Sequence, residues 1–466
     1  MADVTIESVA GLRASASGVV ALPGEPEYDD AVSIWNGAIA KRPAVVVRCA
    51  SNDDVVSALA FAKQAGLEVS VRGGGHNFAG HALCDGGLMI DLTPMKSVTV
   101  DANARRAVCG GGTTWGELDA ATQAHGLAVP GGFISHTGVA GLTLGGGFGW
   151  LSRLAGLSSD NLAAAEVVTA DGRVLRASAD ENADLFWALR GGGGNFGIVT
   201  SFEFDLHAVG PFVQLGLFFF KPEQGREMFT FARDYVRGLP DECGVFLAGL
   251  NAPPAPFVPE ECQMQPAFAL AVVGLRDEAT HADLVAPIRD AITPWFEMVT
   301  PIPYVALQQM FDESAPWGVR AYEKAVYLEE LTDAAIDVIV EHQPKKASPL
   351  SFLPIFALGG AYSRADEDAT AFGGSRRITY LVNVSAAGPT PELYEADREW
   401  VRSFWADLVP HASGVGGYVN FMAEYEEDRV RAAYGAKYER LAQLKATYDP
   451  GNVFHLNANI VPASSS

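Results

Sequence analysis

The sequence predicts an α+β protein built from two lobes of unequal size. Its 466 residues are more than one ordinary hydrophobic core accommodates. The dense clusters among its 49 glycines all fall before residue 200, between short strands and helices. After about residue 210 the chain changes to long strands rich in aromatic and β-branched residues, separated by amphipathic helices. We therefore expect a large antiparallel sheet, covered by helices, in the second half.

Short alternating elements are predicted in the first half. Ser51, followed closely by two aspartates, is typical of a helix N-terminus, and Gly66 ends the helix predicted over residues 55–65. Asp171 and Gly172 predict a tight hairpin between two strands. The strands are expected at residues 44–48, 67–71, 88–92, 106–109, 164–169, 174–177 and 198–202, with further helices at 115–125 and 184–189.

Longer elements are predicted in the second half. Strands are expected at residues 213–220, 267–274, 322–328, 351–357 and 378–384, and helices at 223–239, 278–291 and 332–342. A last helix over residues 434–448 is stopped by the turn-forming run 449–452, Asp-Pro-Gly-Asn.

Composition predicts a cytoplasmic protein without a nucleic-acid or membrane partner. No apolar run approaches the roughly 20 residues that span a bilayer, and the N-terminus lacks the basic and apolar regions of a signal peptide. The five cysteines contain no C-x-x-C pair and are odd in number, which argues against a disulfide framework and favours a reducing compartment. A net charge of −23 repels nucleic acid and anionic membranes. Monomer and homo-oligomer are both compatible with these features.

A glycine-rich loop is the first candidate functional feature. Residues 72–77, Arg-Gly-Gly-Gly-His-Asn, directly follow the strand predicted at 67–71. Glycines let the backbone turn tightly and bring its N–H groups against a large anionic ligand, because no Cβ intervenes. His76 then stands at the mouth of the loop, an unusual place for a purely structural imidazole. The loop is therefore a candidate cofactor site.

Other cofactor sites fit the sequence less well. Residues 190–197 contain G-x-G-x-x-G, but a predicted helix precedes them and a strand follows, the reverse of the order in a dinucleotide-binding crevice. No G-x-x-x-x-G-K-[ST] sequence is present, which excludes a P-loop. No histidine or cysteine spacing suits a metal, so no metal site is predicted. The interpretation that remains is a glycine-rich cradle for a pyrophosphate group in a fold other than the Rossmann fold.

Five motifs occur in a characteristic order along the chain. They are Arg72-Gly-Gly-Gly-His76-Asn77, Pro130-Gly-Gly, the glycine-rich runs 137–150 and 184–197, and Tyr448-Asp-Pro-Gly-Asn-Val-Phe454. Together they resemble the berberine bridge enzyme-like FAD-linked oxidases of the vanillyl-alcohol oxidase superfamily, over residues 42–462. The resemblance implies a PCMH-type FAD-binding domain made from both chain ends, residues 1–209 and 416–466. It implies an inserted substrate-binding domain over residues 210–415.

The resemblance also implies a single covalent bond to the flavin. In the family, the histidine at the position of His76 is joined to the 8α-methyl group of FAD; a histidine that only bonds the loop backbone is the alternative. Many members have a second link through a cysteine, but Ile134 stands at that position here, as in the single-link bacterial subgroup. The FAD-binding residues are expected to be Arg72, Gly73, Gly74, Gly75, His76, Asn77, Gly80, Pro130, Gly131, Ser135, Thr137, Gly138, Gly141, Gly145, Ile198, Asn457 and Asn459.

Three residues are candidates for catalysis. Residues 417–421 have the alternation of a strand, which places Tyr418 and Asn420 on one face beside the flavin. A phenol titrates near pH 10, so Tyr418 would need a neighbouring positive charge to act as a base; packing against the flavin edge is the alternative. Asn383 aligns with a family glutamine or glutamate and can orient a hydroxyl or amine, but it cannot act as a base. His136 is expected either to contact the flavin or substrate or simply to pack.

Further residues concern the pocket and the electron acceptor. Tyr322 and Lys324 are candidates for lining the pocket, whereas Trp317 is expected to pack in the core. Thr137 occupies the family position that controls access of oxygen, where valine accompanies oxidases, and threonine matches valine in size.

The predicted activity is oxidation of a C–OH or C–N bond in a small organic molecule, by hydride transfer to FAD and then electron transfer to O2, with release of H2O2. A dehydrogenase that uses another acceptor, and a flavin-retaining binding protein without turnover, are the alternatives. Sugars, alcohols, alkaloids, amines and antibiotic intermediates all remain possible substrates.

Overall fold

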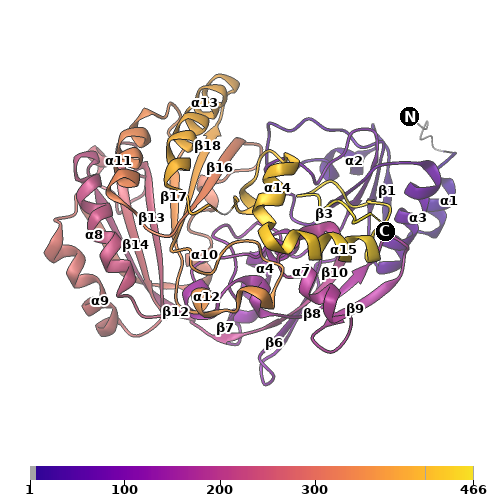
Figure 1. Cartoon of the computed structure of the whole chain (residues 1–466), viewed down its shortest axis with the longest axis horizontal. Coiled ribbons are helices and arrows are strands. Elements are labelled where there is room, and N and C mark those ends of the chain that lie inside the picture. Colours follow the sequence, from indigo (N-terminus) through magenta and orange to yellow (C-terminus); the bar gives the residue numbers. More distant parts are fainter. Residues whose placement is uncertain (1–6, 415, 465–466) are drawn as a thin grey trace.

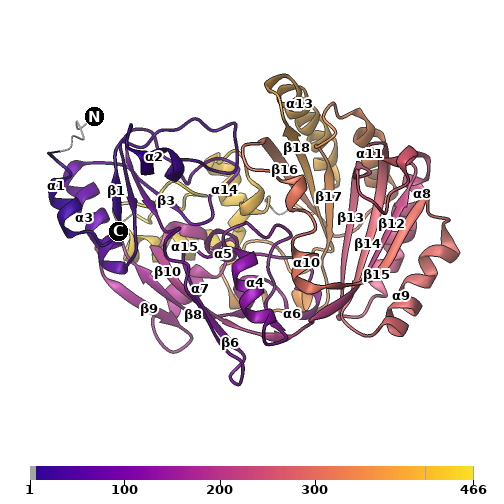
Figure 2. The ribbon, with the colours of Figure 1, turned by 180° about the vertical axis from the view of Figure 1, so that it is seen from behind.

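The computed structural model describes residues 7–414 and 416–464. The molecule is elongated, with the N-terminal strands and the C-terminal helices at one end and one large sheet at the other (Figure 1). The view from behind shows the same arrangement (Figure 2). Within the described residues, no helix is both long and apolar enough to cross a lipid bilayer.

The N-terminal sheet carries the glycine-rich loop at the end of one strand. Helix α3 (Asn52–Ala65) packs on this sheet; it begins where Ser51 Oγ accepts the N–H of Asp54, and it ends at Gly66, whose φ is 64°. In spatial order the four strands are β1 (Val19–Ala21), β2 (Val45–Arg48), β4 (Leu88–Asp91) and β3 (Val69–Arg72). Strands β2, β4 and β3 run parallel, so the loop that follows β3 leaves from the carboxyl end of the sheet.

A second, five-stranded antiparallel sheet lies in the same part of the molecule. Its strands, in spatial order, are β5 (Val98–Asp101), β6 (Arg106–Gly110), β10 (Ile198–Asp205), β8 (Leu162–Val168) and β9 (Val174–Ser178). The hairpin between β8 and β9 turns at Gly172, as predicted, with φ at 83°. Helices α4 (Trp115–Gln123), α5 (Val139–Leu144) and α7 (Ala183–Leu189) contribute to its hydrophobic core.

The large sheet has seven antiparallel strands, as the second half of the sequence predicts. In spatial order they are β15 (Phe296–Pro303), β12 (Phe212–Phe220), β14 (Pro266–Gly274), β13 (Cys243–Asn251), β17 (Leu353–Ala357), β18 (Tyr380–Gly388) and β16 (Arg320–Leu328). One face packs on helices α8 (Gly225–Arg237), α9 (Glu278–Ala291), α11 (Asp333–His342) and α13 (Pro391–Leu408). The opposite face is aromatic and meets residues of the first half of the chain.

The C-terminal segment returns to the N-terminal part of the molecule. It contains α14 (Glu427–Tyr434) and α15 (Tyr438–Tyr448), separated at Gly435, whose φ is 53°. The single helix predicted over 434–448 is therefore shorter, because α14 ends at that glycine and a 3-10 turn over Gly435–Lys437 precedes α15. Leu441 and Ile460 lie in one core with residues of the five-stranded sheet, so both chain ends build the same body.

One predicted strand is absent from the described chain. Residues 417–421 do not pair in a sheet; Val419–Phe421 form a 3-10 turn that begins after Tyr418. The remaining short elements are α1 (Ala10–Ser15), α2 (Pro26–Ala31), β7 (Leu127–Ala128), α6 (Ser152–Ala155), β11 (His207–Ala208), α10 (Tyr304–Gln308) and α12 (Ala361–Arg364).

Candidate cofactor and substrate site

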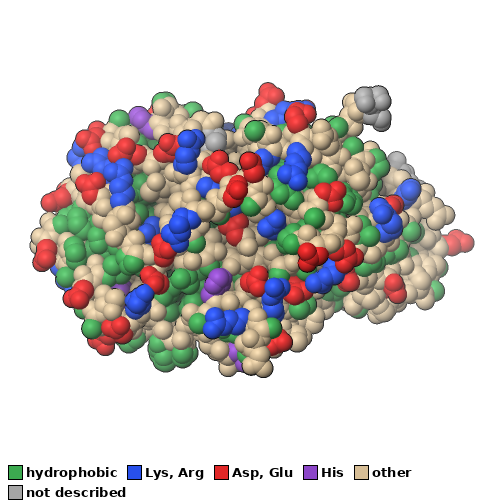
Figure 3. Space-filling model, turned by 60° about the horizontal axis from the view of Figure 1, so that its bottom comes forward, with side chains coloured by type: hydrophobic (Ala, Val, Ile, Leu, Met, Phe, Trp, Pro, Cys, Tyr) green, Lys and Arg blue, Asp and Glu red, His purple; other side chains and the backbone are tan. Residues whose placement is uncertain are grey.

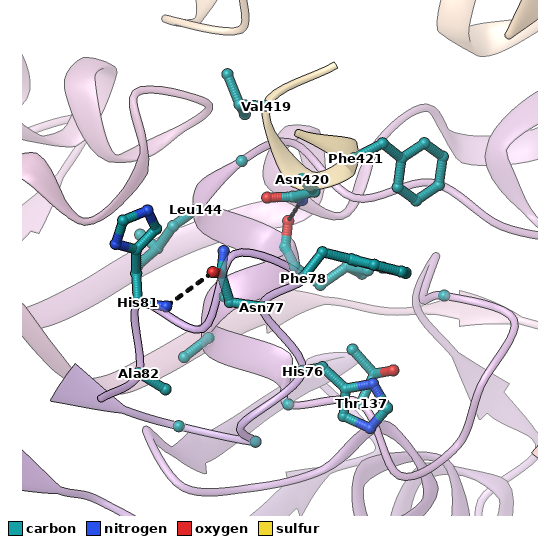
Figure 4. A pocket seen from close by; sticks show the side chains of 18 of the residues that line it. His76, Asn77, Phe78, His81, Ala82, Thr137, Leu144, Val419, Asn420 and Phe421 are labelled. Atoms are coloured by element: carbon teal, nitrogen blue, oxygen red, sulfur yellow. Dashed lines mark hydrogen bonds between the residues drawn. The ribbon is translucent and has the colours of Figure 1, made fainter. Parts of the chain in front are cut away.

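A cavity of about 390 Å³ lies where the two parts of the molecule meet. The loop after β3, the loops over residues 132–145 and 193–198, the aromatic face of the large sheet and the C-terminal segment all line it. Figure 4 shows His76 and Thr137 beside one another, with Asn420 and Phe421 entering from the C-terminal segment. Segments distant in sequence thus form one site, of a volume typical of ligand pockets.

Two of the glycine-rich loops cross in direct contact. A Cβ built on Gly74 would lie 2.2 Å from the backbone nitrogen of Gly138, and a Cβ on Gly138 would lie 2.3 Å from that of Gly74. Neither position accommodates a side chain, which is why the sequence has glycine at both. Gly141 differs, because a Cβ there would meet nothing within 4 Å although the residue lines the cavity. The backbone at Gly141 therefore faces open space that a ligand can occupy.

A buried lysine fixes the third glycine-rich loop. Lys445 Nζ donates to the carbonyl oxygens of Asn195 and Phe454, at 2.8 and 2.9 Å, and pairs with Asp449 Oδ2 at 2.7 Å. This ties loop 193–198 to the C-terminal segment. Asn457, which lines the cavity between them, has a buried Oδ1 atom without a hydrogen-bond partner. An unpartnered buried oxygen next to exposed glycine backbone fits a polar, N–H- or O–H-bearing cofactor such as FAD.

His76 is held by other rings at the mouth of its loop. Its Nε2 lies 2.7 Å from His136 Nδ1. Between ring centres, Trp35 stacks on it at 5.2 Å, and Trp317 lies 5.7 Å away and nearly perpendicular to it. Burial, followed by the neighbouring His136, holds the pKa of His76 well below its ordinary value. The imidazole is therefore neutral at pH 7, the form that can act as a nucleophile.

Asp312 fixes the segment that carries His136. It accepts hydrogen bonds from the backbone N–H of Ser135 at 2.8 Å and from the Ser135 hydroxyl at 2.5 Å. Burial lowers the pKa of His136, and Asp312 partly opposes this shift. His136 thus contacts His76 and does not itself line the cavity.

Tyr418 lines the cavity and is hydrogen-bonded to its neighbours. Its hydroxyl oxygen accepts from the backbone N–H of Gly147 at 2.9 Å and from Asn420 Nδ2 at 2.8 Å. Tyr418 and Asn420 are therefore together, as predicted, but through a 3-10 turn and not along a strand. Burial raises the pKa of Tyr418, and the two N–H groups oppose that shift without supplying a positive charge. The condition for Tyr418 to act as a base is not met by these contacts.

A buried carboxyl group that the sequence analysis did not identify lies on the same wall. Asn383 Nδ2 donates to Glu323 Oε2 at 2.7 Å, and the two residues are only 3% and 1% exposed. Glu323 Oε1 and Asn383 Oδ1 have no hydrogen-bond partner. Burial raises the pKa of Glu323 well above its ordinary value. The alternation of side chains along strand β16 could have identified Glu323. Neighbouring residues of a strand point to opposite faces, so Glu323 faces away from the predicted candidates Tyr322 and Lys324.

Those two candidates lie away from the cavity. Lys324 Nζ contacts Glu424 at 3.2 Å, and Tyr322 packs in the core between the sheet and the outer helices. Trp317 also differs from expectation: it is 44% exposed and touches the edge of His76, so it is not a core residue. The strand register explains why Tyr322 and Lys324 face away, since Glu323, between them, lies opposite Ser385 on the inner face.

The predicted FAD-binding and catalytic residues divide into two groups. Those that line the cavity are Gly73, Gly74, Gly75, His76, Asn77, Thr137, Gly138, Gly141, Gly145, Ile198, Asn383, Tyr418 and Asn457. Those that lie behind it are Arg72, Gly80, Pro130, Gly131, Ser135, His136 and Asn459. Several of the second group support the loops. The Arg72 guanidinium donates to the carbonyl of Ala31, and the carbonyl of Pro130 accepts from Ser158 Oγ at 2.6 Å.

Comparison with known proteins identifies two matching families and several related proteins. Residues 43–178 match the family described as FAD binding domain, and residues 417–461 match the family described as berberine and berberine like. An FAD-linked oxidoreductase of Dictyostelium discoideum is 30% identical over 96% of this chain and 95% of its own length. The structure of 6-hydroxy-D-nicotine oxidase from Arthrobacter nicotinovorans superposes with a TM-score of 0.85 at 28% identity, over 96% of this chain and 99% of that chain.

A further structure shares the fold at lower identity. Glucooligosaccharide oxidase from Acremonium strictum, whose FAD is described as 6-S-cysteinyl and 8α-N1-histidyl, has a TM-score of 0.86 at 24% identity, over 98% of this chain and all of that chain. The fold and the cradle thus define a flavoprotein oxidoreductase that binds FAD. The chain belongs to the berberine bridge enzyme-like family of FAD-linked oxidoreductases, and the predicted PCMH-type α+β fold is confirmed.

Proposed function

We propose that this protein is an FAD-dependent oxidase that oxidises a C–OH or C–N bond of a small organic molecule. The observation that carries the proposal is that one cavity brings the glycine cradle and His76 to face a wall formed by Asn383, Tyr418 and aromatic rings. Bound FAD supplies the two-electron acceptor for such chemistry. The chain's own residues bind and orient the substrate beside it and exclude water.

The division of labour follows the two parts of the molecule. Residues 1–209 and 416–466 would hold FAD, and residues 210–415 would hold the substrate. The shared core of the five-stranded sheet and the C-terminal helices supports this division. In the substrate part, Asn383 would orient the reacting hydroxyl or amine, while Tyr418 and His136 would position substrate and cofactor.

A covalent link through His76 alone completes the proposed cofactor site. Its neutral imidazole supports a bond to the 8α position, and Ile134, which lines the cavity where bicovalent relatives carry cysteine, supports a single link. Acid precipitation should leave the yellow colour with the wild-type protein, and digestion should give one flavin-bearing peptide, the one that contains His76.

His76→Ala should release its FAD on precipitation, because the only attacking nitrogen is lost. His81→Ala is the matched control, since His81 also lines the cavity and should leave the flavin attached. Two flavin peptides from the wild type, or retained colour in His76→Ala, would disprove the single link.

Oxygen is the proposed electron acceptor. Thr137 lines the cavity and has the size of the valine that accompanies oxidases in this family. Stopped-flow reoxidation of the reduced protein in air tests the point: reoxidation slower than turnover with an artificial acceptor would make the protein a dehydrogenase. Anaerobic screening of alcohols, sugars and amines for flavin bleaching tests turnover itself, and a complete absence of bleaching would favour a flavin-retaining binding protein.

A reducing, cytoplasmic location is part of the proposal. All five cysteines lie among the described residues, and all are buried and free. This supports the proposal, because free thiols are typical of proteins in a reducing compartment.

A further inference from the structure

We propose that the substrate is an amine and that Glu323 recognises its positively charged, N–H-bearing nitrogen. The inference rests on the proposed function, because it names the substrate class of the same cavity. It separates amines from the neutral alcohols and sugars that the proposed function also allows.

The hydrogen-bonding capacity of the Glu323–Asn383 pair points to a donor ligand. Asn383 Nδ2 already donates a hydrogen bond to Glu323 Oε2. Burial raises the pKa of Glu323, so in the free protein this carboxyl group keeps its proton, which a bound basic amine can take up. The two atoms left without partners are Glu323 Oε1 and Asn383 Oδ1, and both accept hydrogen bonds once the amine holds the proton. A hydroxyl group donates one hydrogen bond, whereas a protonated primary or secondary amine donates two or more. An amine satisfies both oxygens at once.

The charge around Glu323 points the same way. Lys324, its neighbour in sequence, faces the other side of the sheet and pairs with Glu424. Asn383 is neutral, and Tyr425, whose pKa is raised by burial and in part by Glu323, supplies no positive charge. A buried carboxylate without a counter-charge is costly, which is why burial favours the protonated form of Glu323, and an amine that takes up the proton provides that counter-charge.

The rest of the wall suits an amine attached to a flat apolar group. Phe133 lies 5.1 Å from Phe356, Phe246 lies 5.2 Å from Phe311, and Tyr418 lies 5.1 Å from Phe421, measured between ring centres. All six rings line the cavity. Aromatic faces attract cations and pack against flat apolar groups. They offer few partners for the many hydroxyl groups of a sugar, each of which would lose its water.

The test compares two probes of nearly the same shape. N-methylbenzylamine is positively charged at pH 7, and benzyl methyl ether is neutral. Binding to the FAD-loaded protein is followed without oxygen by the shift of the flavin absorption band. The amine is expected to bind at least about tenfold more tightly than the ether, which corresponds to about 1.4 kcal/mol.

Variants assign the preference to one side chain. Glu323→Gln should bring the two affinities within about twofold, since it keeps the shape and removes the charge. Glu424→Gln, which changes a carboxyl on the opposite side of the same sheet, should leave the preference unchanged. Equal affinities in the wild type, or an unchanged preference in Glu323→Gln, would overturn the inference. The wild-type comparison decides the matter even where Glu323→Gln fails to fold.

The outcomes also separate this inference from the proposed function. A flavin that is bleached by sugars or alcohols and not by amines refutes amine recognition and leaves the oxidase proposal standing. A protein that binds no flavin, or whose flavin no substrate reduces, overturns the proposed function and the amine inference with it.

Discussion

At the scale of single residues, Tyr418 shows how burial changes the role that a side chain can have. Its hydroxyl oxygen accepts two N–H groups, from Gly147 and Asn420, and burial disfavours the phenolate. A phenol in this position orders the turn and the cavity wall. We therefore expect it to position the substrate and not to carry the proton away.

Tyr418→Phe tests this role. Removing the hydroxyl leaves the buried N–H of Gly147 without an acceptor and takes one of two acceptors from Asn420 Nδ2, which should cost about 1–3 kcal/mol of stability. We expect kcat to fall about tenfold, equivalent to about 1.4 kcal/mol, with a pH–rate profile of unchanged shape. Tyr362→Phe is the control, because Tyr362 is equally buried and bonds the carbonyl of Ser375. It should lose stability but keep kcat. A pH profile that loses one limb in Tyr418→Phe would instead make the phenol a titrating base.

Residue identity alone did not reveal the carboxyl group in the cavity. Asn383 was predicted correctly to lie on the wall, since its motif resembles a family strand. Glu323 was missed because its importance depends on which face of β16 points inward and on the pairing of β16 with β18. That pairing joins residues about 60 positions apart, and no local pattern encodes it. Only the three-dimensional structure, which shows how β16 pairs with β18, could therefore place Glu323 on the cavity wall.

At the scale of elements, the local signals predicted most helices and strands well. Capping at Ser51, the glycine at 66 and the hairpin at Gly172 act through neighbouring residues, so the sequence contains their causes. The strand predicted over residues 417–421 was wrong for the opposite reason, because residues distant in sequence determine the shape of this segment. Its alternation is that of a strand, but the segment does not pair with one, and hydrogen bonds of Tyr418 and Asn420 to distant loops decide its shape.

The crossing of two loops gives an element-scale prediction. Gly138→Ala places a Cβ against the backbone of Gly74, which cannot move as a flexible side chain could. We expect a loss of about 1–3 kcal/mol in unfolding free energy and weaker retention of FAD. Gly11→Ala, in α1, adds a methyl group that meets nothing within 4 Å and should be neutral or slightly stabilising. Denaturant unfolding and flavin content would be measured for both. A Gly138→Ala protein as stable and as yellow as the wild type would show that the crossing can relax.

At the scale of the whole molecule, charge is dispersed and the two parts meet at buried polar contacts. Acidic and basic side chains are interspersed on the face shown in Figure 3, so the net charge of −23 marks no single patch there. Exposed pairs such as Arg42 with Asp29 contribute little to stability. The meeting of α4 and α10 is different, because Asp119 is fully buried and receives one hydrogen bond, from Gln308 Nε2 at 3.1 Å.

Burial raises the pKa of Asp119 to about 7, only partly opposed by Gln308. Between about pH 4 and pH 7 the unfolded chain has released this proton while the folded protein still holds it, so this group makes stability fall as pH rises. Above pH 7 the loss is constant and amounts to about 4 kcal/mol, at about 1.4 kcal/mol per pKa unit. Asp119→Asn removes the titration and keeps the shape. The Tm difference, variant minus wild type, should therefore increase from pH 4 to pH 7 and then level off. Parallel Tm profiles for the two proteins across this range would mean that Asp119 keeps an ordinary pKa in the folded state, and that the seam between the two parts admits water.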